Sequence, residues 1–332
     1  MKAAFLRNKD DIIVKEIADC SGSSDRVLLK VDACGICGSD VIEAVRGQKE
    51  YSRFGHEIAG TIIEAGSAVK RLRAGQKVVL DSCTACGNCA NCKNSRPDLC
   101  ETVLPASFAG FAQQTTAPEM GAWVYENLTP EVACLAEPLG VAIDLFNVCE
   151  IKFNAVVLVS GLGPIGLMAL QLAKKAGVSK IYACGLSHSK ARLELAAKFG
   201  ADEIIMVDKT PLDKYKFSPK PEKLLISSPP KTMPGLLNAA AKNAIAGFIG
   251  IGYGEAGNIT FDANYFHFNK LQLRASFASP AMMTPMAVKL LQDGTINGEV
   301  LISHKFKLDD IKEAMRVACD DKENAVKVVV VN

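Results

Sequence analysis

The sequence predicts an α/β protein that combines a mainly-β domain with a doubly wound parallel-sheet domain. Two observations carry this prediction. Over roughly the first 145 residues, short runs of alternating apolar and polar residues are punctuated by turn residues, with few long helical patterns. From residue 155 onward, short buried-strand runs alternate with helical patterns. The length of 332 residues suits about two domains of ordinary size.

In the first region, the runs at 26–33, 57–66 and 76–82 predict strands. Helices are expected over 286–294 and around 309–319, followed by a last strand in KVVVVN, residues 327–332. We expect that strand to return to the first domain. The first domain is therefore predicted to be discontinuous, with residues 1–145 and 285–332, and the second domain spans 146–284.

In the second region, a strand at 155–160 runs into a turn and a helix, and the pattern then repeats. Further strands are expected at 180–185, 203–208, 222–228 and 247–252, and helices at 191–199 and 234–244. The stretch 155–173 is uncharged and about as long as a membrane helix. Its three glycines and one proline break it into a strand, a turn and a helix.

Composition excludes several classes of function. Hydrophobic residues make up 49% of the chain and charged residues 22%, which is typical of a globular protein. The net charge is +2 with the two signs interspersed, so no nucleic-acid or membrane partner is expected. The first residues contain no apolar signal segment, which predicts a cytoplasmic protein. In that compartment, clustered cysteines more often bind metal or react than form disulfides.

Four cysteines fall within fifteen positions: Cys86, Cys89, Cys92 and Cys100. Thiolates are soft ligands, and four of them at this spacing can close a tetrahedral zinc shell. A closed shell leaves no coordination position for substrate. We therefore predict a structural zinc.

A second, open metal site is predicted from residues elsewhere in the chain. Cys37 and His56 each stand in a glycine-flanked turn, and Glu57 follows His56 directly. Glu137 is an isolated acid in an apolar stretch, so it needs a partner if it is buried. Three protein ligands would leave one open position, which is the geometry of catalytic zinc.

With these motifs the chain resembles the zinc-dependent medium-chain dehydrogenases/reductases of the sorbitol and threonine dehydrogenase kind, over essentially its whole length. The resemblance rests on GICGSD around Cys37, GHEIAG around His56, the four structural cysteines, EPL at Glu137, GLGPIG at 161–166 and the ending LISHKFKLDDIKEAM. It implies a GroES-like catalytic domain interrupted by a Rossmann domain.

The resemblance also implies roles for the site residues. Cys37, His56 and either Glu57 or Glu137 would hold the catalytic zinc, and the choice between the two glutamates stays open. A zinc Lewis acid lowers the pKa of an alcohol so that a hydride can leave its carbon for nicotinamide. Ser39 would begin a proton relay, although a serine at a helix start can also simply cap the turn.

A dinucleotide fingerprint follows the strand at 155–160 and opens a helix. Its residues are Gly161, Leu162, Gly163, Pro164, Ile165 and Gly166. The glycines allow a tight turn and the close approach of a pyrophosphate to the helix N-terminus. We therefore expect a nicotinamide dinucleotide here.

The residues after the next strand predict NADP rather than NAD. NAD-selective domains usually end that strand with an acid that binds the ribose hydroxyls, and Gly185 stands in its place. Ser187, Lys190 and Arg192 follow and could bind a 2′-phosphate. The same residues could also be ordinary polar residues at a helix start.

The predicted substrate is a secondary alcohol of a polyol, cyclitol or sugar derivative. Ala278-Ser279-Pro280 stand where sorbitol dehydrogenases have a Phe-Arg-Tyr stretch. Four residues between Ser39 and His56 either line the cleft, which would suit an anionic substrate, or are solvated: Arg46, Lys49, Tyr51 and Arg53. The alternatives are a dehydrogenase of simple alcohols or amino-acid hydroxyls, and a non-enzymatic zinc-binding regulator on the same fold.

The resemblance further suggests a homodimer or homotetramer. The strand expected near 261–266 (FDANYF), or one of its neighbours, would pair across chains.

Overall fold

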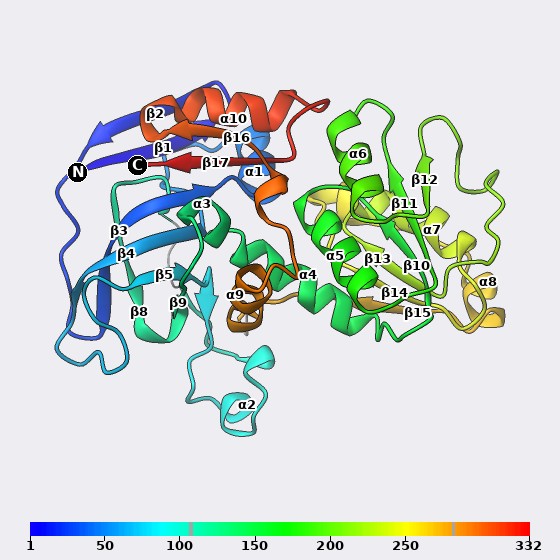
Figure 1. Ribbon diagram of the computed structural model, residues 1–332, viewed down its shortest axis with the longest axis horizontal. Helices are drawn as coiled ribbons and strands as arrows, with labels where there is room; N and C mark the ends of the chain where they lie inside the picture. The colour runs from blue at the N-terminus through cyan, green and yellow to red at the C-terminus, as the bar shows by residue number, and fades with distance from the viewer. Residues whose placement is uncertain (106–108, 281–282) are drawn as a thin grey trace. The chain divides into compact units, whose positions relative to one another are not determined.

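The computed structural model describes residues 1–105, 109–280 and 283–332. The chain divides into two compact units (Figure 1). The first consists of Met1–Gly140 and Ala278–Asn332, and the second of Val141–Phe277. The division falls inside helix α4 (Ala136–Val148). The chain thus leaves the first unit once, forms the second, and comes back.

The first unit is built on a mixed, mostly antiparallel sheet with the strand order β16-β17-β3-β4-β5-β9, and β8 also pairs with β3. The bounds of these strands are β3 (Arg26–Gly35), β4 (Glu57–Ala65), β5 (Lys77–Leu80), β8 (Gln114–Pro118), β9 (Ala122–Val124), β16 (Ile302–Lys307) and β17 (Lys327–Val331). The final strand, β17, pairs antiparallel with β3, so the last apolar run belongs to the sheet of the first unit.

Shorter elements surround this sheet. The hairpin β1 (Lys2–Asn8) and β2 (Asp11–Glu16) and the pair β6 (Cys83–Thr84) and β7 (Leu104–Pro105) add small sheets. The helices are α1 (Gly38–Arg46), α2 (Ala90–Lys93), α3 (Pro130–Ala133), α9 (Thr284–Gln292) and α10 (Ile311–Asp320). Alternate residues of β3, among them Val27, Leu29 and Val31, enter one core with Ile311 and Met315 of α10, because side chains of a strand alternate between its faces.

The second unit is a six-stranded sheet in the order β12-β11-β10-β13-β14-β15, and every adjacent pair is parallel. The strands are β10 (Val156–Ser160), β11 (Lys180–Gly185), β12 (Glu203–Met206), β13 (Lys223–Ile226), β14 (Ile245–Phe248) and β15 (Gln272–Ala275). The helices are α5 (Pro164–Lys175), α6 (Lys190–Lys198), α7 (Met233–Ala239) and α8 (Ala263–Phe268). The predicted doubly wound sheet is confirmed.

The strand order reverses at β10, which lies between β11 and β13. The chain first crosses to β11 and β12 and then returns to the other side of β10. Ligands of such sheets bind beyond the carboxyl ends of the strands at this reversal. The glycine-rich turn after β10 therefore stands at the expected ligand position.

The strand predicted near 261–266 is wrong, because this segment begins helix α8. The carboxylate of Asp262 accepts hydrogen bonds from the backbone N–H groups of Asn264 and Tyr265 at 2.8 and 3.0 Å. Such an N-cap satisfies donors that a helix start leaves unpaired. The edge strand of the sheet is β15, which follows α8 in the chain.

The uncharged stretch 155–173 forms β10 and most of α5, separated by a turn as predicted. Among the described residues, no helix combines the length and the apolar character needed to cross a membrane.

Candidate metal centres and cofactor site

The four cysteines of the 86–100 loop converge. Their sulfur atoms all lie within 4.8 Å of one another, and the Cys86–Cys92 and Cys89–Cys100 pairs are each 4.0 Å apart. A tetrahedral zinc with bonds of about 2.3 Å needs sulfur–sulfur edges of about 3.8 Å. Backbone N–H groups of Asn88 and Cys89 point at the Cys86 sulfur at 3.4 and 3.3 Å, which favours its thiolate form. The donor set therefore fits a four-thiolate zinc.

A second group joins three of the four residues predicted for the open site. Ligand atoms of Cys37, His56 and Glu57 all lie within 4.8 Å of one another. The sheet explains this convergence, because Gly35 near the end of β3 pairs with Glu57 at the start of β4. Glu57 is 1% exposed, and its Oε2 atom forms an ion pair with Lys327. A thiol, an imidazole and a carboxylate this close together form a donor set that fits zinc.

Asp40 supports this group, although the sequence analysis gave it no role. Its Oδ2 accepts the backbone N–H of Cys37 at 2.8 Å, and its Oδ1 lies 3.9 Å from His56 Nδ1. At this distance Asp40 and His56 interact through charge rather than through a hydrogen bond. Burial alone would lower the pKa of His56. The hydrogen bond with Cys37 and the charges of Glu137, Cys37 and Asp40 together raise it well above its ordinary value.

Lys327 was also missed by the sequence analysis. This lysine of β17 is 2% exposed, forms an ion pair with Glu57 and donates to the backbone oxygen of Ile36 at 2.9 Å. The charge of Glu57 raises the pKa of Lys327 against the lowering effect of burial, so the lysine stays charged. A Cβ atom at Gly35 would lie 2.8 Å from Lys327 Cε and would also strike Glu57. Glycine at 35 thus leaves room for the ion pair.

Glu137, the fourth predicted residue, lies in the first turn of α4 next to the compact group but outside it. Burial raises the pKa of Glu137 to about 7, and the charge of Glu57 adds to the rise. His56, Lys327 and a hydrogen bond with Ser82 oppose it. Ser39, the predicted start of a proton relay, is half-buried and is the second residue of α1, two positions after Cys37.

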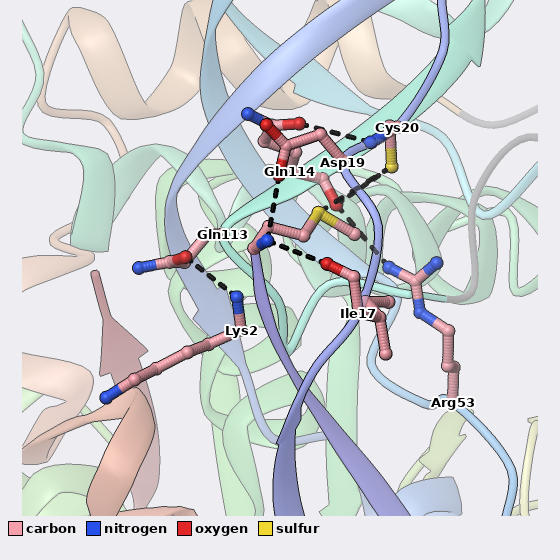
Figure 2. A network of polar contacts seen from close by, with 8 residues as sticks. Lys2, Ile17, Asp19, Cys20, Arg53, Gln113 and Gln114 are labelled. Atoms are coloured by element: carbon pink, nitrogen blue, oxygen red, sulfur yellow. Dashed lines mark hydrogen bonds and ion pairs between the residues drawn. The ribbon is translucent and has the colours of Figure 1, made fainter.

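Two of the four residues weighed as cleft lining, Tyr51 and Arg53, have other contacts. Tyr51 donates its hydroxyl to Asp11 at 2.6 Å. Arg53 donates to the backbone oxygen of Gln114 at 3.4 Å, within a polar network that also holds Cys20 (Figure 2). These contacts tie both side chains to the packing of neighbouring strands and loops. They lend no support to an anionic substrate.

In the second unit, the fingerprint glycines differ in what they do. Gly161 has a φ of +90°, and a Cβ there would lie 2.7 Å from the Ser227 hydroxyl. At Gly166 a Cβ would lie 1.8 Å from the backbone oxygen of Gly161, so glycine lets α5 pack on the turn. Gly163, the N-cap residue of α5, has nothing within 4 Å of the Cβ position. This open space at a helix N-terminus fits a pyrophosphate.

The residues after β11 are already engaged. A Cβ at Gly185 would lie 2.9 Å from methyl groups of Leu162 and Leu193. Ser187 donates both its backbone N–H and its hydroxyl to Asp208, at 2.8 and 2.5 Å. Lys190 is exposed and Arg192 is half-buried, and burial lowers the pKa of the Arg192 guanidinium. Asp208 was not considered in the sequence analysis.

Comparisons with known proteins identify the family to which the chain belongs. A family model for the alcohol dehydrogenase GroES-like domain matches residues 23–127, and one for zinc-binding dehydrogenases matches 164–293. Sorbitol dehydrogenase of Bacillus subtilis (strain 168) is 27% identical over 344 residues, covering 99% of this chain and 97% of that protein. L-threonine 3-dehydrogenase of Pyrococcus horikoshii is 30% identical over 309 residues, covering 88% and 87%. A zinc-binding dehydrogenase of Sinorhizobium meliloti 1021 bound to NADP superposes with a TM-score of 0.88 at 25% identity, covering 100% and 99%.

Proposed function

Because the chain belongs to the zinc-dependent medium-chain dehydrogenase/reductase superfamily, we propose that it moves a hydride between a secondary alcohol of a polyol, cyclitol or sugar derivative and a nicotinamide dinucleotide. The observation that carries this proposal is the convergence of Cys37, His56 and the buried carboxylate of Glu57 in a single group. The sorbitol dehydrogenase relative supports the polyol class. The NADP-bound neighbour supports a nicotinamide cofactor.

The residues present would divide the work as follows. Cys37, His56 and Glu57 would hold the catalytic zinc, which when bound acts as a Lewis acid on the substrate oxygen. Glu57 is favoured over Glu137 because it lies inside the compact group. Asp40, whose Oδ1 lies 3.9 Å from His56 Nδ1, would support the ring through its charge.

A proton must leave the alcohol when its hydride is transferred. Ser39 lies at the start of α1, beside the turn of Cys37, and would accept that proton and pass it outward. At Gly163, the bare N-terminus of α5 would receive the pyrophosphate. The cysteines of the 86–100 loop would hold a second, structural zinc, giving two per chain.

The closest competing function is a zinc-binding regulator without catalysis, which the open Gly163 turn argues against. Oxidation of simple alcohols or amino-acid hydroxyls is the other alternative. The similarity to an L-threonine 3-dehydrogenase is the reason to include L-threonine among the substrates tested. A homodimer or homotetramer stays a prediction, which sedimentation would check. The preference for NADP predicted from Gly185 also stays a prediction, and the position of Asp208 gives reason to revise it.

The experiment pairs metal analysis with a substrate screen. Polyols, cyclitols, sugar phosphates, simple alcohols and L-threonine are offered with NAD and with NADP, and cofactor reduction is followed at saturating zinc. Cys37→Ser should abolish turnover, lose one zinc and leave the fold intact. Cys20→Ser is the matched control, since Cys20 is a half-buried cysteine outside both groups. Full activity in Cys37→Ser would overturn the proposed site, and no turnover with any alcohol would favour the regulator.

A further inference from the structure

Strand β11 does not end with the acid that usually binds the cofactor ribose, yet a carboxylate from the next strand lies at the same place. Strands β11 and β12 are parallel with Gly185 opposite Met206. The backbone N–H of Val207 donates to the backbone oxygen of Gly185 at 3.0 Å. The next residue, Asp208, is therefore held at the carboxyl end of β11, where the ribose of a dinucleotide is bound in such folds.

Ser187 fixes the orientation of that carboxylate. One oxygen of Asp208 accepts the Ser187 backbone N–H at 2.8 Å, and the other accepts the hydroxyl at 2.5 Å. These two bonds lower the pKa of Asp208, so its negative charge persists at neutral pH. Asp208 is exposed, and its remaining lone pairs can accept further hydrogen bonds.

A side chain at position 185 would crowd the ends of two leucine side chains. A Cβ there would lie 2.9 Å from the methyl groups of Leu162 and Leu193, so a side chain at 185 would have to displace both leucines. Ser187 is a possible ligand of a 2′-phosphate, but its backbone N–H and its hydroxyl both donate to Asp208. The charge nearest to these donors is thus negative.

We propose that Asp208, positioned by Ser187, is the residue that selects the cofactor, and that it favours NAD over NADP in place of the acid missing at 185. Its carboxylate accepts a ribose hydroxyl of NAD. A 2′-phosphate carries roughly two negative charges, and it would meet the same carboxylate and be repelled. The inference rests on the proposed nicotinamide-dependent function and reverses the preference predicted from Gly185 alone.

The test measures binding of NADH and NADPH to the zinc-loaded protein by cofactor fluorescence. The parent should bind NADH more tightly, and Asp208→Asn should shift the ratio of dissociation constants toward NADPH by about tenfold or more, the loss of one charge-assisted contact. Ser187→Ala should shift it in the same direction but less, because the backbone N–H still holds Asp208. Asp213→Asn is the control, since it removes an exposed negative charge from the same loop region.

The outcomes separate this inference from the proposed function, because binding needs no alcohol. A parent that prefers NADPH, an unchanged ratio in Asp208→Asn, or an equal shift in Asp213→Asn overturns the role of Asp208 even if turnover is found. Selective NADH binding without turnover of any alcohol overturns the proposed reaction and leaves the role of Asp208 standing. If the parent binds neither nucleotide, both proposals fail.

Discussion

Asp81 is a buried carboxyl whose replacement should change how stability depends on pH. It is 4% exposed and follows β5, and its two oxygens accept hydrogen bonds from Trp123 Nε1 at 2.9 Å and from the Thr284 hydroxyl. Burial outweighs both bonds and raises the pKa of Asp81 from 3.8 to about 6. The folded state therefore holds a proton that the unfolded chain has already released.

The sign follows from proton linkage. Below the unfolded pKa both states are protonated, so Asp81 costs nothing. As pH rises from about 4 to about 6, stability falls by about 1.4 kcal/mol per pH unit, and above pH 6 a constant cost of about 3 kcal/mol remains. Asp81→Asn removes this pH-dependent cost. The substitution also adds a cost that does not depend on pH. The nitrogen of the new amide group cannot accept a hydrogen bond, so one of the two donors loses its partner.

The assay is urea unfolding from pH 4.5 to 7.5, followed by the fluorescence of Trp123, the only tryptophan in the chain. Because Trp123 contacts Asp81 directly, the signal reports on the first unit. Between pH 4.5 and 6 the unfolding free energy of the variant should rise by about 2 kcal/mol relative to that of the parent, with little further change above pH 6.5. Asp10→Asn, at an exposed aspartate, is the control. A stability difference that does not vary with pH would refute the raised pKa.

Three further predictions concern the two sites. Lys327→Met should lower the unfolding free energy by about 3–5 kcal/mol, because it leaves Glu57 buried and unpaired. The double variant Lys327→Met with Glu57→Gln should recover part of this loss. Equal stability of the single variant and the parent would contradict the ion pair. Cys92→Ser should release one zinc to a chromophoric chelator and lower the melting temperature, and unchanged zinc content would remove the closed shell. Gly163→Ala should fold normally but bind NADH more weakly than the parent. Gly166→Ala should fail to fold, because its Cβ would clash with the backbone of the turn. Equal NADH affinity in Gly163→Ala and the parent would show that the turn holds no pyrophosphate.

How much the sequence could predict depends on how local the signal is. The four clustered cysteines lie within fifteen positions, and the glycine fingerprint lies directly between a strand and a helix, so spacing alone was enough to predict both. Lys327 is different, because it reaches Glu57 only through the pairing of β17 with β3. In the sequence it is one polar residue before a run of valines. No local pattern marks it as the partner of an acid 270 positions earlier.

Two misses did have a usable signal. The aromatic run at 261–266 resembles a strand, but Asp262 near its start is a typical N-cap residue, and the residues after it form helix α8. Asp208 ends the run EIIMVD, which was correctly read as the strand following β11. Neighbouring parallel strands bring their carboxyl ends to the same edge of the sheet. On this ground alone Asp208 could have been predicted to lie near Ser187.

The two candidate sites draw on separate parts of the chain, which makes their roles separable. Every residue proposed to hold metal lies within 1–140, and every residue proposed to hold cofactor lies within 141–277. A substitution at Cys37 removes a metal ligand without touching the Gly163 turn, so Cys37→Ser should keep the NADH affinity of the parent while losing turnover. A substitution at Gly163 should keep both zinc ions. If either variant lost both functions together without unfolding, the division of labour between the two units would be wrong.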